Sequence, residues 1–380
     1  MMPATISRTS CDKESDSRPY FDKEMTNVVK GIALIIMFIH HFFTFPYWWV
    51  SSVSYPYFEK LWPYLQPPTR LCVPIFCFLT GYFYYFTREK TFRYSFKKIS
   101  DLLVSYWFIY IPLALFASIV MDYKYTPMLF LQELFAFNTP TMIFCWYVNF
   151  YCLFMLIMPL IVKVITNSIH VNLFITIILT PTLFHLIGML IGKYSIILHD
   201  AFKSIYFCLP NVLVGYLFAK HSIFRQIESC CINQIHNKTT HIILAICAII
   251  FIPLGRYIEP SMTIVLHKLP LFNENISFYI CFDVLYAPFF IYFFIYVIKT
   301  INIGYLRHGL SIIGKNSVLM WFIHCLFFAN SKTIFQPLLY FPKNPILVLL
   351  WGIVICLAIS FVCNKLITKI NDKKNKLFFS

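Results

Sequence analysis

The chain has 380 residues, of which 59% are hydrophobic and only 12% are charged. With a mean hydropathy of +0.71, this composition excludes an ordinary soluble domain and indicates an integral membrane protein. The formal net charge of +15 reflects 31 Lys and Arg residues against 16 Asp and Glu residues. Because basic residues gather in the cytoplasmic loops of membrane proteins, this charge does not call for a nucleic-acid partner.

The first apolar stretch, residues 27–50, contains a lysine near its start and two adjacent histidines. Lys30 and His41 are eleven residues apart, so at about 100° per residue they lie within about 20° of each other on one helical face. Ionisable groups are costly to bury in a membrane, which makes His40 and His41 candidates for a functional site. The alternative is structural: a lysine that extends to the interface and a histidine that bonds to a neighbouring helix.

Apolar stretches able to cross the membrane recur along the whole chain. We expect an all-α, polytopic integral membrane protein with about ten transmembrane helices. An even number of spans puts both termini on one side, and that side carries most of the Lys and Arg residues, so we expect both termini in the cytoplasm. The spans are centred near Met37, Cys77, Tyr110, Phe154, Leu179, Val212, Ala248, Pro288, Phe322 and Val354.

The chain is expected to form one membrane domain between two polar ends. These are a cytoplasmic tail at residues 1–25, the transmembrane domain at 26–364 and a basic cytoplasmic tail at 365–380. The short apolar stretch 127–137 contains Glu133 and predicts a re-entrant segment or an outer-surface helix. Stretch 266–271 is similarly short. The outer loop 255–277 has polar side chains suited to a hydrophilic substrate: Arg256, Glu259, His267, Lys268 and Glu274.

Some residue types argue for or against further sites. The 13 cysteines lie mostly in apolar stretches without a Cys-x-x-Cys pair, which predicts neither a disulfide framework nor a metal site. Asp283 is the one acidic residue that we place inside a predicted span, where it orients a catalytic histidine, pairs with Lys30 or lies at the interface. Arg70, at the outer end of the second span, either binds the substrate or marks the membrane boundary.

Four motifs follow one another between residues 24 and 362. They are KGIA at 30–33 with His41, VPIF at 73–76 with LTGYF at 79–83, WYV at 146–148 with Pro159, and GKNS at 314–317 with WFIH at 321–324. Taken together, they resemble the membrane-bound acyltransferase 3 family, which O-acylates cell-surface carbohydrates.

The chain departs from this family's usual pattern at a few positions. Lys30 stands where arginine is common, and the lysine lacks the bidentate fork of a guanidinium. Thr80 stands where serine is frequent. Between Trp146 and Pro159 there is Asn149 and no carboxylate, whereas many family members have glutamates just after this tryptophan. The resemblance is therefore to the sugar-acetylase-like branch, and the acidic partner of the catalytic histidine is unassigned.

The resemblance implies roles for individual residues. Ten residues separate the basic residue from the histidine, and this spacing implies that His41, rather than His40, is the general base. Acyl transfer to a hydroxyl needs a base because an alcohol is a poor nucleophile, and histidine suits this role with an ordinary pKa near 6.5. His324, Lys30 and Asp283 are candidates to assist it. The predicted substrate-binding residues are Arg70, Tyr82, Trp146, Asn316 and Ser317.

The resemblance also implies acetyl-CoA as the acyl donor, with no metal. The basic segment 88–98 contains Arg88, Lys90, Arg93, Lys97 and Lys98, side chains that suit the donor's phosphates. Of these, we predict that Arg93, Lys97 and Lys98 bind the donor. The alternative is that topology alone places a basic loop here.

We therefore expect a membrane O-acetyltransferase that modifies a surface polysaccharide or its lipid-linked precursor. The expected location is the inner or plasma membrane of a bacterium, with membrane lipids, acyl-CoA and a carbohydrate acceptor as partners. Two alternatives stay open: a saccharide exporter or flippase that transfers no acyl group, and the same enzyme class using succinyl or another acyl group. The oligomeric state is unassigned.

Overall fold

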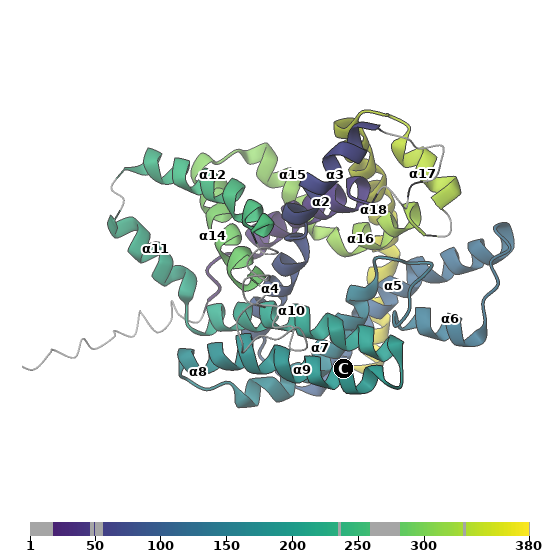
Figure 1. The fold of residues 1–380 in the computed structure, drawn as a ribbon, viewed down its shortest axis with the longest axis horizontal. Helices are drawn as coiled ribbons and strands as arrows, with labels where there is room; N and C mark the ends of the chain where they lie inside the picture. Colours follow the sequence, from purple (N-terminus) through teal and green to yellow (C-terminus); the bar gives the residue numbers. More distant parts are fainter. Residues whose placement is uncertain are drawn as a thin grey trace, which may run out of the picture.

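The computed structural model describes residues 18–45, 49, 56–234, 237–258, 282–329 and 332–379. Within these ranges all regular structure is helical and there is no strand. Helix α2 (Lys23–Phe43) packs against helices from both halves of the chain, and most closely against α15 (Gly304–Lys315) (Figure 1). The all-α fold class predicted from the sequence is confirmed for this part of the chain.

The helices range from six residues in α8 to 34 residues in α18. Short π-helical and 3-10 turns, η2 to η4, extend some of them. After α2 the elements are α3 (Pro56–Thr69), α4 (Cys72–Tyr85), α5 (Phe92–Val120), α6 (Pro127–Leu134), α7 (Trp146–Val164), α8 (Ile169–Phe174), η2 (Ile175–Leu179), α9 (Thr180–Gly192), α10 (Ile196–Lys220), α11 (Ile223–Gln234), α12 (Lys238–Leu254), η3 (Gly255–Tyr257), α14 (Asp283–Ile301), α15 (Gly304–Lys315), α16 (Ser317–His324), η4 (Cys325–Phe327), α17 (Lys332–Tyr340) and α18 (Pro345–Phe378).

Seven helices in the described ranges are long and apolar enough to cross a membrane: α2, α5, α7, α8 joined to α9, α12 with η3, α14 and α18. Two further pairs, the end of α10 with α11 and α15 with α16, pass the same test together but are bent by 67°. Helix α4 has 14 residues, fewer than the roughly 20 that a straight span needs. The protein is thus a multi-pass membrane protein with seven to nine candidate spans, while the count of ten and the cytoplasmic termini stay predictions.

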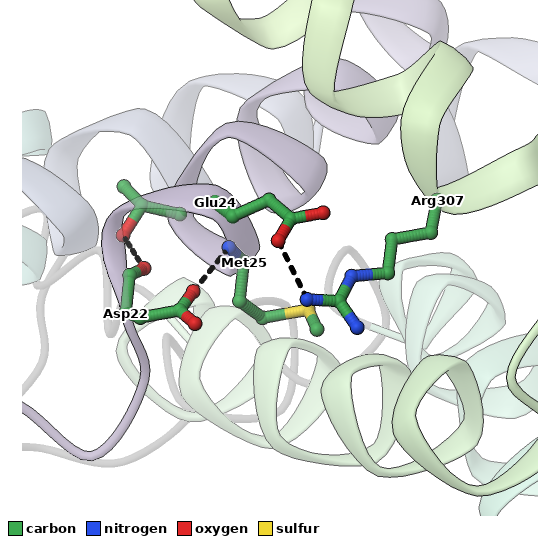
Figure 2. A network of polar contacts seen from close by, with 5 residues as sticks. Asp22, Glu24, Met25 and Arg307 are labelled. Carbon is green, nitrogen blue, oxygen red and sulfur yellow. Dashed lines mark hydrogen bonds and ion pairs between the residues drawn. The ribbon is translucent and has the colours of Figure 1, made fainter. Parts of the chain in front are cut away.

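The start of α2 is fixed by polar contacts at its first turn. The Asp22 carboxylate accepts a hydrogen bond from the Met25 backbone N–H at 2.7 Å, as an N-cap residue does. Glu24 in the same turn pairs with Arg307 of α15 at 2.6 Å (Figure 2). Acidic side chains at a helix N-terminus also interact favourably with the helix dipole. The ion pair ties the start of α2 to α15, while the Asp22 contact lies within the first turn of α2 itself.

Two helix pairs pack with their backbones in direct contact. In the pair α2 and α15, a Cβ added to Gly31 would lie 2.9 Å from the carbonyl carbon of Leu310. In the pair α4 and α10, a Cβ added to Gly81 would lie 2.6 Å from the carbonyl carbon of Val212. Small residues allow such close approach in membranes, where van der Waals packing drives helix association. These two glycines therefore fix the spacing of the central helices.

Helix α18 is longer than a membrane span requires. Its 34 residues extend for about 51 Å, against roughly 30 Å of hydrocarbon. The predicted division between a membrane domain and a basic tail, after residue 364, falls inside this helix. Near its end, Lys374 pairs with Asp101 of α5 at 2.7 Å, and the Asn375 amide donates to the same carboxylate at 3.3 Å. The last turns of α18 are thereby held against α5.

The stretch 127–137 forms α6, which is not among the candidate spans. Glu133 is fully buried and accepts hydrogen bonds from the backbone N–H of Thr141 at 2.6 Å and from its hydroxyl at 2.8 Å. Burial nevertheless raises the pKa of the Glu133 carboxyl above its ordinary value. The stretch 266–271 and the loop residues Glu259, His267, Lys268 and Glu274 lie outside the described residues.

Candidate functional site

A large cavity of about 1880 Å³ runs between the central helices. Its walls come from α2, α4, α5, α7, α10, α14, α15, α16 and α18. One part of it, called here the lysine end, is lined by Lys30, Lys98 and Lys315, and another part, the arginine end, is lined by Arg70 and Arg256. Pockets for one small ligand usually measure about 300 to 1000 Å³. The cavity is therefore large enough for two substrates.

At the arginine end, the Arg256 guanidinium forms an ion pair with the Asp283 carboxylate. Arg256 is only 6% exposed, and both side chains line the cavity. The partner that the structure gives Asp283 is thus an arginine of η3, whereas the sequence suggested a histidine or Lys30. Arg70 lies at the same end, because Arg70 and Arg256 are both within electrostatic range of His40. A buried charge needs such a partner to be tolerated.

At the lysine end, Lys30 lies within electrostatic range of two other lysines, Lys98 and Lys23. Lys98 is on α5 and lines the cavity, and its ammonium group lies 5.6 Å from the centre of the Tyr94 ring. Arg93 and Lys97, the other two residues predicted to bind the donor, do not line this cavity, and neither do Arg88 and Lys90. The cations that line the cavity around Lys30 are therefore Lys23 and Lys98, and Lys315 of α15 lines it as well.

Between the two ends, the structure brings His41 of α2 and His324 of α16 together. His41 Nδ1 and His324 Nε2 are 2.7 Å apart, although the residues are 283 positions apart in the chain. His41 lines the cavity, whereas His324 is fully buried behind it. Lys30 is eleven residues before His41, which is about 16 Å along the helix axis. Of these two histidines, His41 is therefore the one that faces the cavity, and His324 is its hydrogen-bond partner.

The hydrogen bonds of this pair fix the proton on each ring. His324 Nδ1 contacts the carbonyl oxygen of Trp321, and a carbonyl only accepts, so His324 Nδ1 carries the proton. His324 Nε2 is then an acceptor in the neutral ring and receives the proton of His41 Nδ1. The remaining nitrogen of His41, Nε2, is left with a free lone pair. A neutral histidine that has Nδ1 protonated and Nε2 unprotonated is arranged to act as a base.

An aromatic side chain holds the His41 ring in place. Phe144 stacks on it with ring centres 3.7 Å apart and planes within 9° of parallel. Phe144 precedes the Trp146 motif by two residues, and sequence reasoning did not single it out. The only indication in the sequence was its position two residues before the Trp146 motif. The stack and the His324 hydrogen bond together define both the position and the rotation of the His41 ring.

His40 has a different environment from His41. Its Nδ1 lies 2.8 Å from the hydroxyl oxygen of Thr69, at the end of α3. That hydroxyl donates to the Leu65 carbonyl at 2.6 Å, so it accepts from His40. His40 also lines the cavity, near the arginine end. The two neighbouring histidines therefore bond to different parts of the fold.

Most of the predicted substrate-binding residues line the cavity, and one does not. Trp146, Asn316 and Ser317 join Arg70 in the wall. Asn316 and Ser317 lie where the chain bends by 67° between α15 and α16, and an irregular backbone at membrane depth is typical of a cavity wall. Tyr82 lies elsewhere: its hydroxyl accepts from the Tyr20 backbone N–H at 2.8 Å, and its ring does not face the cavity.

Metal ligands do not gather anywhere in the described part of the chain. No group of three or more His, Cys, Asp and Glu side chains is close enough there to hold a metal ion. The buried thiols of Cys145 and Cys325 lie 3.6 Å apart beside His324. The chemical groups that line the cavity therefore include two oriented imidazoles, cations at two ends, carboxylates, and amide and hydroxyl groups.

Comparison with known proteins gives one match. A family model for an acyltransferase domain, that of acyltransferase 3, matches residues 26–365. Searches of curated proteins and of solved structures find no match. The matched range contains His41, His324 and both ends of the cavity, except for residues 18–23 and the last turns of α18. Because this match covers most of the chain, the protein belongs to the acyltransferase 3 family of membrane acyltransferases.

Proposed function

We propose that this membrane acyltransferase moves an acetyl group from acetyl-CoA to a hydroxyl of a surface polysaccharide or of its lipid-linked precursor. The observation that carries the proposal is the orientation of His41, whose Nδ1 is bound by His324 at 2.7 Å while the side chain faces a cavity of about 1880 Å³. A base held in this way suits transfer to a hydroxyl, the step in which an alcohol must lose its proton.

The reaction follows from this geometry. His41 Nε2 takes the proton of the acceptor hydroxyl as the hydroxyl oxygen attacks the thioester carbonyl carbon. The carbon–sulfur bond then breaks, and the same proton passes from His41 to the departing sulfur, which leaves as the free thiol. While His41 is protonated, His324 Nε2 still accepts from its Nδ1 and stabilises the positive charge. His324 is therefore a positioning residue, since it does not face the cavity.

The two ends of the cavity suit two different substrates. The lysine end offers Lys30, Lys98 and Lys315 to the phosphates of the donor. The arginine end offers Arg70 and the Arg256–Asp283 pair to a hydrophilic acceptor. We place the lysine end on the cytoplasmic side of a bacterial inner or plasma membrane, because most basic residues of the chain are predicted on that side. Lys30 is about 16 Å from His41 along α2, so it binds the donor rather than the reacting carbonyl.

The test compares acetate esters on surface glycan from cells that express wild type, His41→Ala or His308→Ala at equal membrane levels. His308 is an exposed histidine of α15 that does not line the cavity, which makes it the matched control. We expect ester with wild type and His308→Ala, and a loss of about 10²- to 10⁴-fold in transfer rate with His41→Ala. Mass analysis of the ester identifies the acyl group and separates acetyl from succinyl.

Two results would contradict the proposal. Equal ester levels with His41→Ala and wild type would exclude His41 as the base. If wild type adds no ester of any kind while saccharide export depends on the protein, the chain is a carrier and not an acetyltransferase.

A further inference from the structure

The last turns of α18 contribute a polar wall to the lysine end of the cavity. Asn364, Thr368, Asn371 and Asn375 all line it. Their spacing of four, three and four residues places them on one face of the helix. The last three lie beyond residue 365, where the family match ends. This wall is therefore a feature of the chain that family membership does not explain.

Two amide oxygens on this face are buried without a hydrogen-bond partner. These are Oδ1 of Asn371 and Oδ1 of Asn375. A buried polar atom with no partner costs free energy, and most such atoms in folded proteins are paired. The two oxygens are closed off from the cavity in this conformation, but both side chains line it, and a rotation about the last side-chain bond would turn an oxygen towards a ligand there.

The asparagine face of α18 lies beside Lys98, at a position that suits the nucleoside of the donor. Asp101 of α5 accepts from Lys374 and Asn375, and Lys98 is one helical turn before Asp101. The amides of α18 thus lie beside the cation that faces the cavity from α5. A ligand whose phosphates reach Lys98 therefore has its nucleoside near Asn371 and Asn375.

The distance between Asn371 and His41 fits a long ligand whose reactive group and nucleobase lie at opposite ends. Gly352 of α18 packs against the ring of Phe42, the neighbour of His41. Asn371 is 19 residues further along the helix, or about 28 Å. Coenzyme A carries its thioester and its adenine at opposite ends of a long flexible arm, so it can reach both places at once.

We propose that the end of α18 binds the adenine of the acyl donor, with Asn371 Oδ1 accepting a hydrogen bond from the exocyclic amino group and Asn375 Oδ1 facing the same nucleoside. This inference rests on the proposed function, in which the donor is an acyl-CoA. An asparagine amide suits adenine because it offers an acceptor to the amino group and a donor to the neighbouring ring nitrogen.

The experiment measures binding of acetyl-CoA to the full-length protein in lipid nanodiscs by equilibrium dialysis. A second ligand is the acetyl-CoA analogue with purine in place of adenine, which lacks the exocyclic amino group. Asn371→Ala is compared with wild type and with Lys369→Ala, since Lys369 is an exposed residue of the same helix that does not line the cavity.

We expect Asn371→Ala to weaken acetyl-CoA binding about 3- to 10-fold, the effect of one hydrogen bond, and to weaken binding of the purine analogue by a smaller factor, because the analogue keeps the ring nitrogen but lacks the amino group. Lys369→Ala should bind both ligands as wild type does. In transfer assays, Asn371→Ala should raise KM for acetyl-CoA by the same factor and leave kcat near the wild-type value.

The inference is overturned if Asn371→Ala binds acetyl-CoA as tightly as wild type, or if it loses affinity equally for both ligands. In either case transfer by wild type with loss in His41→Ala would leave the proposed function standing. If wild type neither binds acetyl-CoA nor forms an ester, the proposed function itself fails and takes this inference with it.

Discussion

Removal of the His324 side chain tests whether the histidine pair works as the geometry indicates. In His324→Ala, the proton on His41 Nδ1 loses the acceptor that lies 2.7 Å away in a fully buried position. A buried donor left without its partner costs about 1 to 3 kcal/mol. If that cost falls on the transition state, in which His41 becomes charged, kcat drops about 5- to 150-fold. The stack of Phe144 on His41 is retained, so the ring stays near its place.

The assay measures initial rates of acetyl transfer in membranes that contain equal amounts of folded protein. Because His324→Ala also leaves a space in a buried cluster, His324→Gln is measured beside it. The carbonyl oxygen of glutamine accepts a hydrogen bond as His324 Nε2 does, so we expect it to restore part of kcat. KM for acetyl-CoA should change little in both variants. Wild-type kcat in His324→Ala, or equal losses in folded alanine and glutamine variants, would refute the assigned role of this hydrogen bond.

Two further predictions concern stability. A Cβ at Gly81 would lie 2.6 Å from the Val212 carbonyl carbon, so Gly81→Ala should destabilise the protein by about 1 to 3 kcal/mol through overpacking. Gly309→Ala, with nothing within 4 Å of its new Cβ, is the control, and equal unfolding midpoints for the two variants would contradict the packing argument. Burial raises the pKa of Glu133, so the protonated carboxyl is favoured by folding; stability is greatest below the ordinary pKa and falls as pH rises through the raised one. Relative to Glu133→Gln, wild type should lose stability in denaturant titrations as pH rises from about 4 to 7; a pH-independent difference between them would show that this carboxyl does not titrate as described.

Helical periodicity was enough to predict part of the site. Lys30 and His41 were placed on one helical face from their spacing alone, and both line the cavity. The contact of His41 with His324 joins residues 283 positions apart, and no local pattern specifies such a distant pairing. The family motifs supplied both histidines, but only the packing of α16 against α2 shows that their rings touch.

The ends of the chain were harder to interpret. Residues 365–380 appear in the sequence as a basic tail, because lysines dominate their composition, yet α18 continues through most of them. A signal was present in the asparagines, whose spacing places them on one helical face. Tyr82 was expected in the substrate site, but it stacks on Phe21, with ring centres 5.0 Å apart. Phe21 belongs to residues 1–25, whose polar composition predicted a cytoplasmic tail.

The number of spans depended on how helices bend. Apolar length alone favoured ten crossings, and the tenth is the stretch near Cys77, which forms the 14-residue α4. A hydropathy pattern also does not distinguish a straight helix from a broken one. Helices α15 and α16 turn by 67° at Asn316, where the backbone leaves regular geometry beside the cavity. Short polar side chains such as Asn316 and Ser317 compete for backbone hydrogen bonds, which is a local hint of a break but not of its angle.

The glycine contacts also decide which parts of the molecule can move during turnover. At Gly31 and Gly81 the backbones of α2 and α15, and of α4 and α10, already touch, so these pairs shift only as rigid units. Helices α5 and α18 meet near the lysine end through the side chains of Asp101 and Lys374, and an ion pair of this kind breaks without any helix unpacking. If the donor enters at the lysine end, as proposed, separating this ion pair opens that flank and leaves both glycine contacts intact.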